Sequence, residues 1–158
     1  MVDIEDLLAR AKAQGLRIAT VESCTGGMVA AALTDIPGSS AVVERGYVTY
    51  SNAAKEEMLG VSSETLAAVG AVSEEVAAEM AEGALARSAA TLTVSITGIA
   101  GPGGSEFKPE GRVCFGLAKG DGPPVTETVE FGALGRDRVR LAARDHALTL
   151  LLDALTPE

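Results

Sequence analysis

The chain passes from a strand pattern into a helix within one ten-residue stretch, Gly46-Tyr47-Val48-Thr49-Tyr50-Ser51-Asn52-Ala53-Ala54-Lys55. Residues 48–50 alternate as in a strand, and Ser51 and Asn52 are residue types that cap helix N-termini. Lys55 therefore falls in the first helical turn, where a cation opposes the helix dipole. This field, together with any burial, disfavours the ammonium form and so lowers the lysine pKa. Lys55 is then a candidate general base toward a serine, the alternative being a solvated lysine on an exposed helix.

Strand and helix patterns alternate on both sides of this stretch. Strands are predicted over residues 16–21, within 41–50, and over 91–97, 112–119 and 125–131. Helices are predicted between Asp3 and Gly15, over 28–33, after Ser51, near Ser62 or Ser63, from Ser73, and over 136–155. Strands separated by helices and followed by a hairpin predict an α/β protein with a mixed sheet, a three-layer α/β/α sandwich. At 158 residues, positions 1–158 are expected to form one domain.

Composition and charge exclude several classes of function. The formal charge of −9 argues against nucleic-acid binding, which needs a basic face. No apolar run is long enough to span a membrane, and the acidic N-terminus is unlike a secretory signal, so a soluble cytoplasmic protein is expected. Two cysteines and one histidine are too few for a protein-only zinc site, and no metal or cofactor is expected. That single histidine, His146, lies in a helical apolar pattern and is interpreted as a packing residue.

Hydroxyl-rich loops are expected to meet at one edge of the sheet. They are residues 23–27, 39–40, 50–55 and 97–104, and ligands of open α/β sheets bind at the carboxyl ends of the strands. Hydroxyls and a lysine suit nucleophilic hydrolysis better than metal or redox chemistry. The segment 22–27 leads from a strand into a small-residue helix, which either directs backbone N–H groups at a ligand or simply packs closely.

A glycine-rich loop, residues 98–111, follows the strand over 91–97. Pro102 and Pro109 exclude a dinucleotide fingerprint, which needs a helix directly after the glycines. The loop is interpreted as a binding loop or lid, the alternative being a plain surface connection.

Four ordered motifs resemble the CinA C-terminal domain, the nicotinamide mononucleotide deamidase family, over about residues 3–155. They are Glu22-Ser23-Cys24-Thr25-Gly26-Gly27, the stretch 46–55, Gly70-Ala71-Val72-Ser73 and Thr97-Gly98-Ile99-Ala100-Gly101-Pro102. The resemblance is to the freestanding form of the family rather than the form fused behind a larger domain. It implies hydrolysis of the carboxamide of nicotinamide mononucleotide to nicotinate mononucleotide and ammonia, without a metal, in pyridine nucleotide salvage.

The resemblance also implies site residues. Ser40 is the preferred nucleophile, with Ser23 as the other candidate, Lys55 as the base and Tyr50 as partner to either. The substrate-binding candidates are Thr25, Gly26, Gly27, Thr97, Gly98, Gly101, Arg136 and Arg140. The family's C-terminal motif, roughly Gly-Asp-Arg-x-x-Val-Arg, reads here as Leu134-Gly135-Arg136-Asp137-Arg138-Val139-Arg140, with glycine in place of the aspartate.

Two rival interpretations stay open at this point. Cys24 follows Ser23 at a strand-to-helix turn, where a helix N-terminus would lower a thiol pKa and allow a cysteine hydrolase. A catalytically silent nucleotide-binding or regulatory domain is the alternative from another class. A homodimer or higher homo-oligomer is expected on general grounds.

Overall fold

The computed structural model describes residues 2–105, 107–120 and 122–156. Glu106, in the predicted glycine-rich loop, and Asp121, in the predicted hairpin connection, lie outside the described residues, as do Met1 and residues 157–158. The helices are α1 (Ile4–Ala13), α2 (Met28–Thr34), α3 (Asn52–Leu59), α4 (Ser63–Val69), α5 (Glu74–Ala86) and α6 (Arg136–Leu155). The strands are β1 (Ile18–Glu22), β2 (Val43–Val48), β3 (Leu92–Gly98), β4 (Arg112–Lys119) and β5 (Val125–Glu130).

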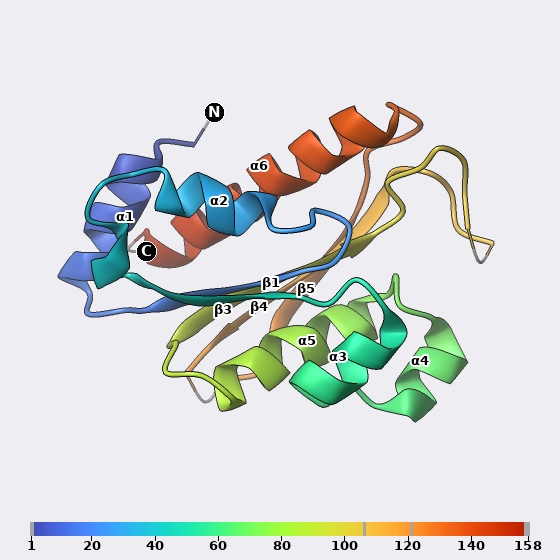
Figure 1. The fold of residues 1–158 in the computed structure, drawn as a ribbon, viewed down its shortest axis with the longest axis horizontal. Helices are drawn as coiled ribbons and strands as arrows, with labels where there is room; N and C mark the ends of the chain where they lie inside the picture. The colour runs from blue at the N-terminus through green and yellow to red at the C-terminus, as the bar shows by residue number, and fades with distance from the viewer. Residues whose placement is uncertain (1, 106, 121, 157–158) are drawn as a thin grey trace.

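The five strands form one mixed sheet in the order β2-β1-β3-β4-β5. β1 runs parallel to β2 and β3, whereas β4 and β5 pair antiparallel as a hairpin. Helices α1, α2 and α6 cover one face and α3, α4 and α5 the other, so the predicted three-layer α/β sandwich is confirmed (Figure 1). None of the described helices is both long and apolar enough to cross a membrane.

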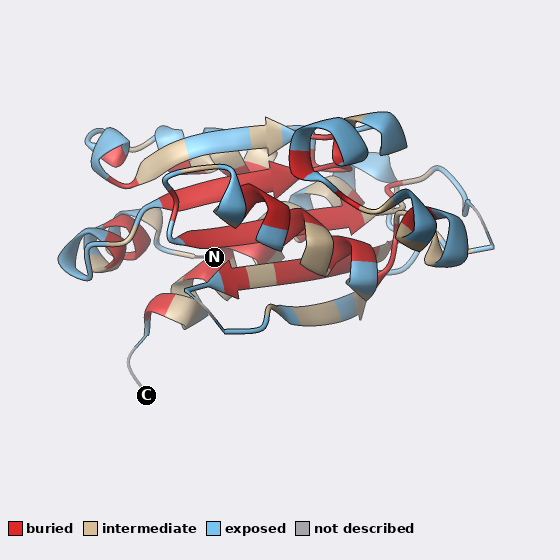
Figure 2. Ribbon diagram, turned by 90° about the horizontal axis from the view of Figure 1, so that it is seen from below, coloured by how far each residue is buried: buried red, intermediate tan, exposed pale blue. Residues whose placement is uncertain are grey.

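The core is built on both faces of the three central strands. β1 is buried at every position and β3 at all but its last, whereas the edge strands β2 and β5 contain only partly buried and exposed residues (Figure 2). Aliphatic side chains fill the layer under α1, α2 and α6, and a second cluster lies under α3 to α5. Strands covered on both faces are typical of parallel βαβ units, and they leave the strand ends as the place for a site.

The register of the parallel strands brings three chain segments together. Glu22, the last residue of β1, pairs with Val48 of β2 and Ile96 of β3. Ser23, Thr49 and Thr97, one position further along each strand, therefore lie side by side at the carboxyl edge of the sheet. The predicted meeting of the loops at 23–27, 50–55 and 97–104 is thus observed, but residues 39–40 belong to the opposite edge.

Candidate active site

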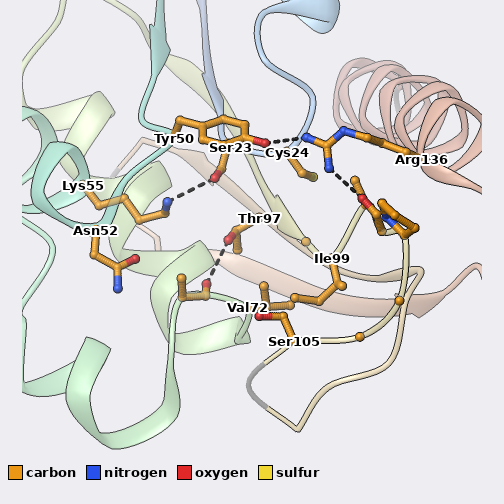
Figure 3. Close-up of a pocket in the computed structure, with 17 residues that line it drawn as sticks. Ser23, Cys24, Tyr50, Asn52, Lys55, Val72, Thr97, Ile99, Ser105 and Arg136 are labelled. Atoms are coloured by element: carbon orange, nitrogen blue, oxygen red, sulfur yellow. Dashed lines mark hydrogen bonds between the residues drawn. The ribbon is translucent and has the colours of Figure 1, made fainter.

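A cavity of about 320 Å³ opens at the carboxyl ends of β1, β2 and β3. It is enclosed by the turn after β1, the start of α3, the α4–α5 connection, the glycine-rich loop and the first residue of α6 (Figure 3). Its lining residues are Ser23, Cys24, Tyr50, Asn52, Lys55, Ala71, Val72, residues 97–105 and Arg136.

Lys55 is buried at this site, with 1% of its surface exposed. Ser51 caps α3 by accepting a hydrogen bond from the Ala54 amide, which holds the first helical turn against the ends of the strands. Lys55 Nζ lies 3.1 Å from Ser23 Oγ and 2.7 Å from the carbonyl oxygen of Thr49 (Figure 3). Desolvation by burial lowers the pKa of Lys55 below its ordinary value, with a small opposing effect from Cys24. The solvated-lysine interpretation is therefore wrong.

The turn after β1 is held by the buried carboxylate of Glu22. Its oxygens accept hydrogen bonds from the amides of Gly27, Val29 and Ala30 at 3.2, 2.9 and 3.0 Å. These N–H groups at the start of α2 are therefore used within the protein and are not directed at a ligand. Of the residues predicted to bind substrate, Thr25, Gly26 and Gly27 do not line the cavity.

Cys24 lines the cavity but lacks the environment of a reactive thiol. Burial raises the pKa of the Cys24 thiol from 9.0 to about 11, an effect larger than the opposing influence of Arg140 and Lys55. The thiolate is the nucleophilic form, so this shift works against the cysteine-hydrolase interpretation. The expected net lowering of the thiol pKa is not found, because desolvation outweighs the lowering by a backbone hydrogen bond. The Glu22 carboxylate already accepts amide hydrogen bonds at the start of α2.

Of the residues that the resemblance implied for substrate binding, Thr97, Gly98 and Gly101 line the cavity. The hydroxyl of Thr97 donates to the Ala71 carbonyl oxygen at 2.9 Å, so it ties β3 to the α4–α5 connection. A Cβ at Gly98 would lie 2.7 Å from a methyl group of Val113, which explains the glycine by close packing between β3 and β4.

Arg136 lies at the rim, at the start of α6. Its guanidinium donates to the Gly101 carbonyl oxygen at 2.7 Å and to the Tyr50 hydroxyl at 2.6 Å (Figure 3). Tyr50 thus partners an arginine rather than Ser23 or Lys55, and 61% of its surface is exposed. Arg140 does not line the cavity, because it donates to the carbonyl oxygens of Cys24 and Thr25 and holds their turn in place.

Ser40 is not brought to this site within one chain. It belongs to a short 3₁₀ turn, Ser39–Ala41, before β2, whereas Tyr50 and Lys55 follow β2. The six residues of β2 separate the two ends by roughly 20 Å at about 3.3 Å per residue. The predicted contact between Ser40 and Lys55 is therefore not formed, and Ser23 takes that place.

The structure also adds polar residues that the sequence interpretation did not single out. Asn52 and Ser105 line the cavity, and Lys108 and Glu110 tie down the glycine-rich loop from either side of Pro109. The sequence signal that could have identified Lys108 and Glu110 was the pair of charged side chains beside a proline in a long glycine-rich loop.

His146 lies away from the cavity, beside Glu127 and the rings of Phe115 and Phe131. The described part of the chain contains no group of three or more His, Cys, Asp or Glu side chains that could hold a metal ion.

The fold and cavity define an α/β sandwich protein with a buried lysine–serine pair at the carboxyl ends of parallel strands. Residues 3–155 match the model of the CinA C-terminal domain, and the chain belongs to this family, as its motifs predicted. It is 55% identical over 141 residues to the nicotinamide-nucleotide amidohydrolase PncC of Escherichia coli (strain K12), covering 89% of this chain and 85% of that protein. It is 56% identical over 147 residues to a CinA-like protein of Chlorobium phaeobacteroides (strain BS1), of which it spans 35%.

Solved structures of related proteins share the fold over nearly the full chain. The competence/damage inducible protein CihA from Agrobacterium tumefaciens is 49% identical and superposes with a TM-score of 0.88, covering 98% of this chain and 96% of that one. A competence-damaged protein (CinA) superfamily protein from Enterobacter cloacae is 35% identical with a TM-score of 0.92, covering 99% and 94%.

Proposed function

We propose that this chain hydrolyses the carboxamide of nicotinamide mononucleotide to nicotinate mononucleotide and ammonia, a reaction of pyridine nucleotide salvage. The observation that carries the proposal is the 3.1 Å contact between Ser23 Oγ and the buried Lys55 Nζ in a cavity at the strand ends. The names of the relatives from Escherichia coli and Enterobacter agglomerans, both nicotinamide-nucleotide amidohydrolases, support the choice of reaction.

In the proposed mechanism Ser23 is the nucleophile and Lys55 is the general base. Neutral Lys55 takes the proton from Ser23 Oγ, and the oxygen attacks the carboxamide carbon to form a tetrahedral intermediate. Backbone N–H groups of a glycine-rich turn at the site would hold the oxyanion. The Lys55 ammonium then protonates the amide nitrogen, the C–N bond breaks and ammonia leaves. Water attacks the acyl-enzyme, which releases nicotinate mononucleotide and restores Ser23. Burial of Lys55 supports this assignment because it lowers the pKa of the amine and so favours the neutral form that a general base requires.

Arg136 is the proposed ligand of the substrate phosphate. A molecule with a net charge of −9 needs a local cation to hold this anion, and Arg136 is a lining residue at the rim of the cavity. Tyr50 hydrogen-bonds to the same guanidinium and would orient it. We keep the expectation that residues 1–158 act as one cytoplasmic domain without a metal or cofactor, as a homodimer or higher homo-oligomer.

The test is ammonia release from nicotinamide mononucleotide by the purified protein in EDTA, beside its Ser23→Ala and Ser40→Ala variants. We expect release by the parent and by Ser40→Ala, and a loss of at least about 10³-fold in Ser23→Ala, as for other nucleophile deletions. Ser40→Ala is the matched control, because it removes the same hydroxyl at the other edge of the sheet.

Other outcomes separate the alternatives. Loss of turnover in Ser40→Ala alone would return the nucleophile to Ser40, in an arrangement that one chain does not form. Loss of activity in EDTA that is restored by added metal would contradict metal-free hydrolysis. Binding of the nucleotide by the parent without ammonia release would favour the silent nucleotide-binding domain.

A further inference from the structure

Glu110 joins the glycine-rich loop to the start of α6. One oxygen of its carboxylate accepts a hydrogen bond from the Gly103 amide at 2.6 Å, and the other accepts one from the Gly135 amide at 3.0 Å. The side chain also packs on Gly101, where an added Cβ would lie 2.6 Å from the Glu110 carboxyl carbon. A single half-buried side chain therefore contacts two segments that are about thirty residues apart in the sequence.

These contacts hold both the backbone before Arg136 and the acceptor of its guanidinium. Glu110 holds Gly135, the residue directly before Arg136, while the Arg136 guanidinium donates to the carbonyl oxygen of Gly101. Glu110 also packs on Gly101 itself, so both ends of the arginine side chain depend on where this carboxylate lies. Glu110 does not line the cavity, and it can act on the site only through these neighbours.

The start of α6 has no capping side chain of its own. Gly135 is its N-cap residue and makes no side-chain hydrogen bond, and its φ of 96° is a conformation that residues with a side chain rarely adopt. The family's C-terminal motif, Gly-Asp-Arg-x-x-Val-Arg, has an aspartate at this position. Here a carboxylate reaches the positive end of the helix from the glycine-rich loop instead, which is the favourable location for a negative charge.

The opposite wall of the cavity is held by a cation from the same loop. Lys108 Nζ donates to the carbonyl oxygens of Val69 and Val72 at 2.6 and 2.7 Å, at the C-terminal end of α4 and in the connection beyond it. The segment Lys108-Pro109-Glu110 thus anchors the loop at two helix ends, each with the charge that the helix dipole favours.

We propose that Glu110 is the positioning residue for the phosphate end of the substrate: its carboxylate fixes the glycine-rich loop against α6 and thereby sets the place of the Arg136 guanidinium. The inference rests on the proposed function, in which Arg136 binds the phosphate of the nucleotide. It predicts that Glu110 affects substrate binding and not the chemical step, because Ser23 and Lys55 make no contact with it.

The experiment compares Glu110→Gln, Arg136→Gln and the double variant, with nicotinamide mononucleotide and nicotinamide riboside as substrates. Gln keeps the size of the side chain but only one acceptor oxygen. We expect Glu110→Gln to raise KM for the mononucleotide about tenfold, with kcat changed less than about twofold, as for the loss of one hydrogen bond to a charged group. KM for the riboside, which lacks the phosphate, should stay unchanged. Because Glu110 acts through Arg136, adding Glu110→Gln to Arg136→Gln should change KM by less than about twofold.

The matched control is Glu130→Gln, which removes a carboxylate paired with Arg112 on the strands that follow the same loop. It should leave KM for both substrates unchanged. Additive effects of the two single variants, or an equal loss with both substrates, would overturn the positioning role.

A readout independent of turnover keeps this inference distinct from the proposed function. Amide hydrogen exchange of residues 98–105 and 132–138 should rise together in Glu110→Gln and stay at the parent level in Glu130→Gln. Unchanged exchange in Glu110→Gln would overturn the inference. If the parent released no ammonia from the mononucleotide, the proposed function would fail, while the exchange measurement would still decide whether Glu110 joins the loop to α6.

Discussion

Among single residues, Lys55 and Cys24 show how one physical cause has two chemical consequences. Both side chains line the same cavity and both are buried. Desolvation disfavours a charge on either group, so it lowers the pKa of Lys55 and raises that of Cys24. Desolvation thereby favours the neutral amine, the form that the proposed base requires, and the protonated thiol, the less nucleophilic form.

The activity should therefore depend on pH through Lys55. A base must be unprotonated, so kcat/KM should rise with pH through the lowered pKa of Lys55 and then level off. Lys55→Arg keeps the positive charge but cannot lose its proton in this range, so it should reduce turnover about 10³-fold at every pH.

The measurement is kcat/KM from pH 5 to pH 9 for the parent and Lys55→Arg, with folding checked by circular dichroism. Lys119→Arg, an exposed lysine on β4, is the control and should keep the parent profile. A profile of the parent that is flat over this range would contradict the role of Lys55 as the base.

Among the elements, the turn from β1 into α2 depends most on one internal charge. The Glu22 side chain is fully buried and accepts three amide hydrogen bonds at the start of α2, where the helix dipole favours a carboxylate. The same turn carries Ser23, so the capping of this helix also fixes the direction of the serine that faces Lys55.

Replacing Glu22 should make the folded protein less stable. We expect Glu22→Gln to lower the free energy of unfolding by about 2 kcal/mol and Glu22→Ala by about 3 kcal/mol or more, because buried N–H groups lose their acceptor. Urea unfolding measures both, with the exposed Glu57→Gln on α3 as the control expected to change it by less than about 0.5 kcal/mol. Equal stability of Glu22→Gln and the parent would mean that the carboxylate contributes nothing to the turn.

In the whole molecule, topology collects the site from both halves of the chain. The parallel strands β2, β1 and β3 deliver Tyr50, Ser23 and Thr97 to one edge. The antiparallel hairpin β4–β5 then returns the chain to the same edge, so that α6 begins there and presents Arg136 (Figure 1). This return is what completes the rim.

The net charge of the whole molecule is unfavourable for binding to nucleic acid. With a net charge of −9 the protein should repel the phosphate backbone of DNA, while the proposed substrate, with a single phosphate, would need only one arginine at the rim. We expect no change in fluorescence polarisation of a labelled DNA duplex at micromolar protein and physiological salt. A rise that disappears at high salt would reveal a basic surface that the composition does not predict.

The sequence alone was enough for the features that depend on neighbouring residues. Alternating apolar positions and capping residues such as Ser51 predicted the helices and strands, and the order of strands predicted a mixed sheet, because these signals are local. The structure does not bring Ser40 to Lys55 within one chain, and the preference for Ser40 as nucleophile came from the family resemblance, not from a local signal. The place of Ser40 before β2, with Tyr50 after it, already put the two at opposite ends of one strand.

Only the tertiary structure decided which distant groups are in contact and how far they are shielded from solvent. The contact of Lys55 with Ser23 joins residues 32 positions apart, and Glu110 reaches Gly135 across 25 positions. The pKa of Lys55 is lowered because other segments of the chain pack over its side chain and exclude water. Residues 46–55 alone do not specify which segments pack there. Local sequence therefore determined the elements and the candidate base, whereas long-range packing selected its partner serine, because both contact and desolvation depend on the whole fold.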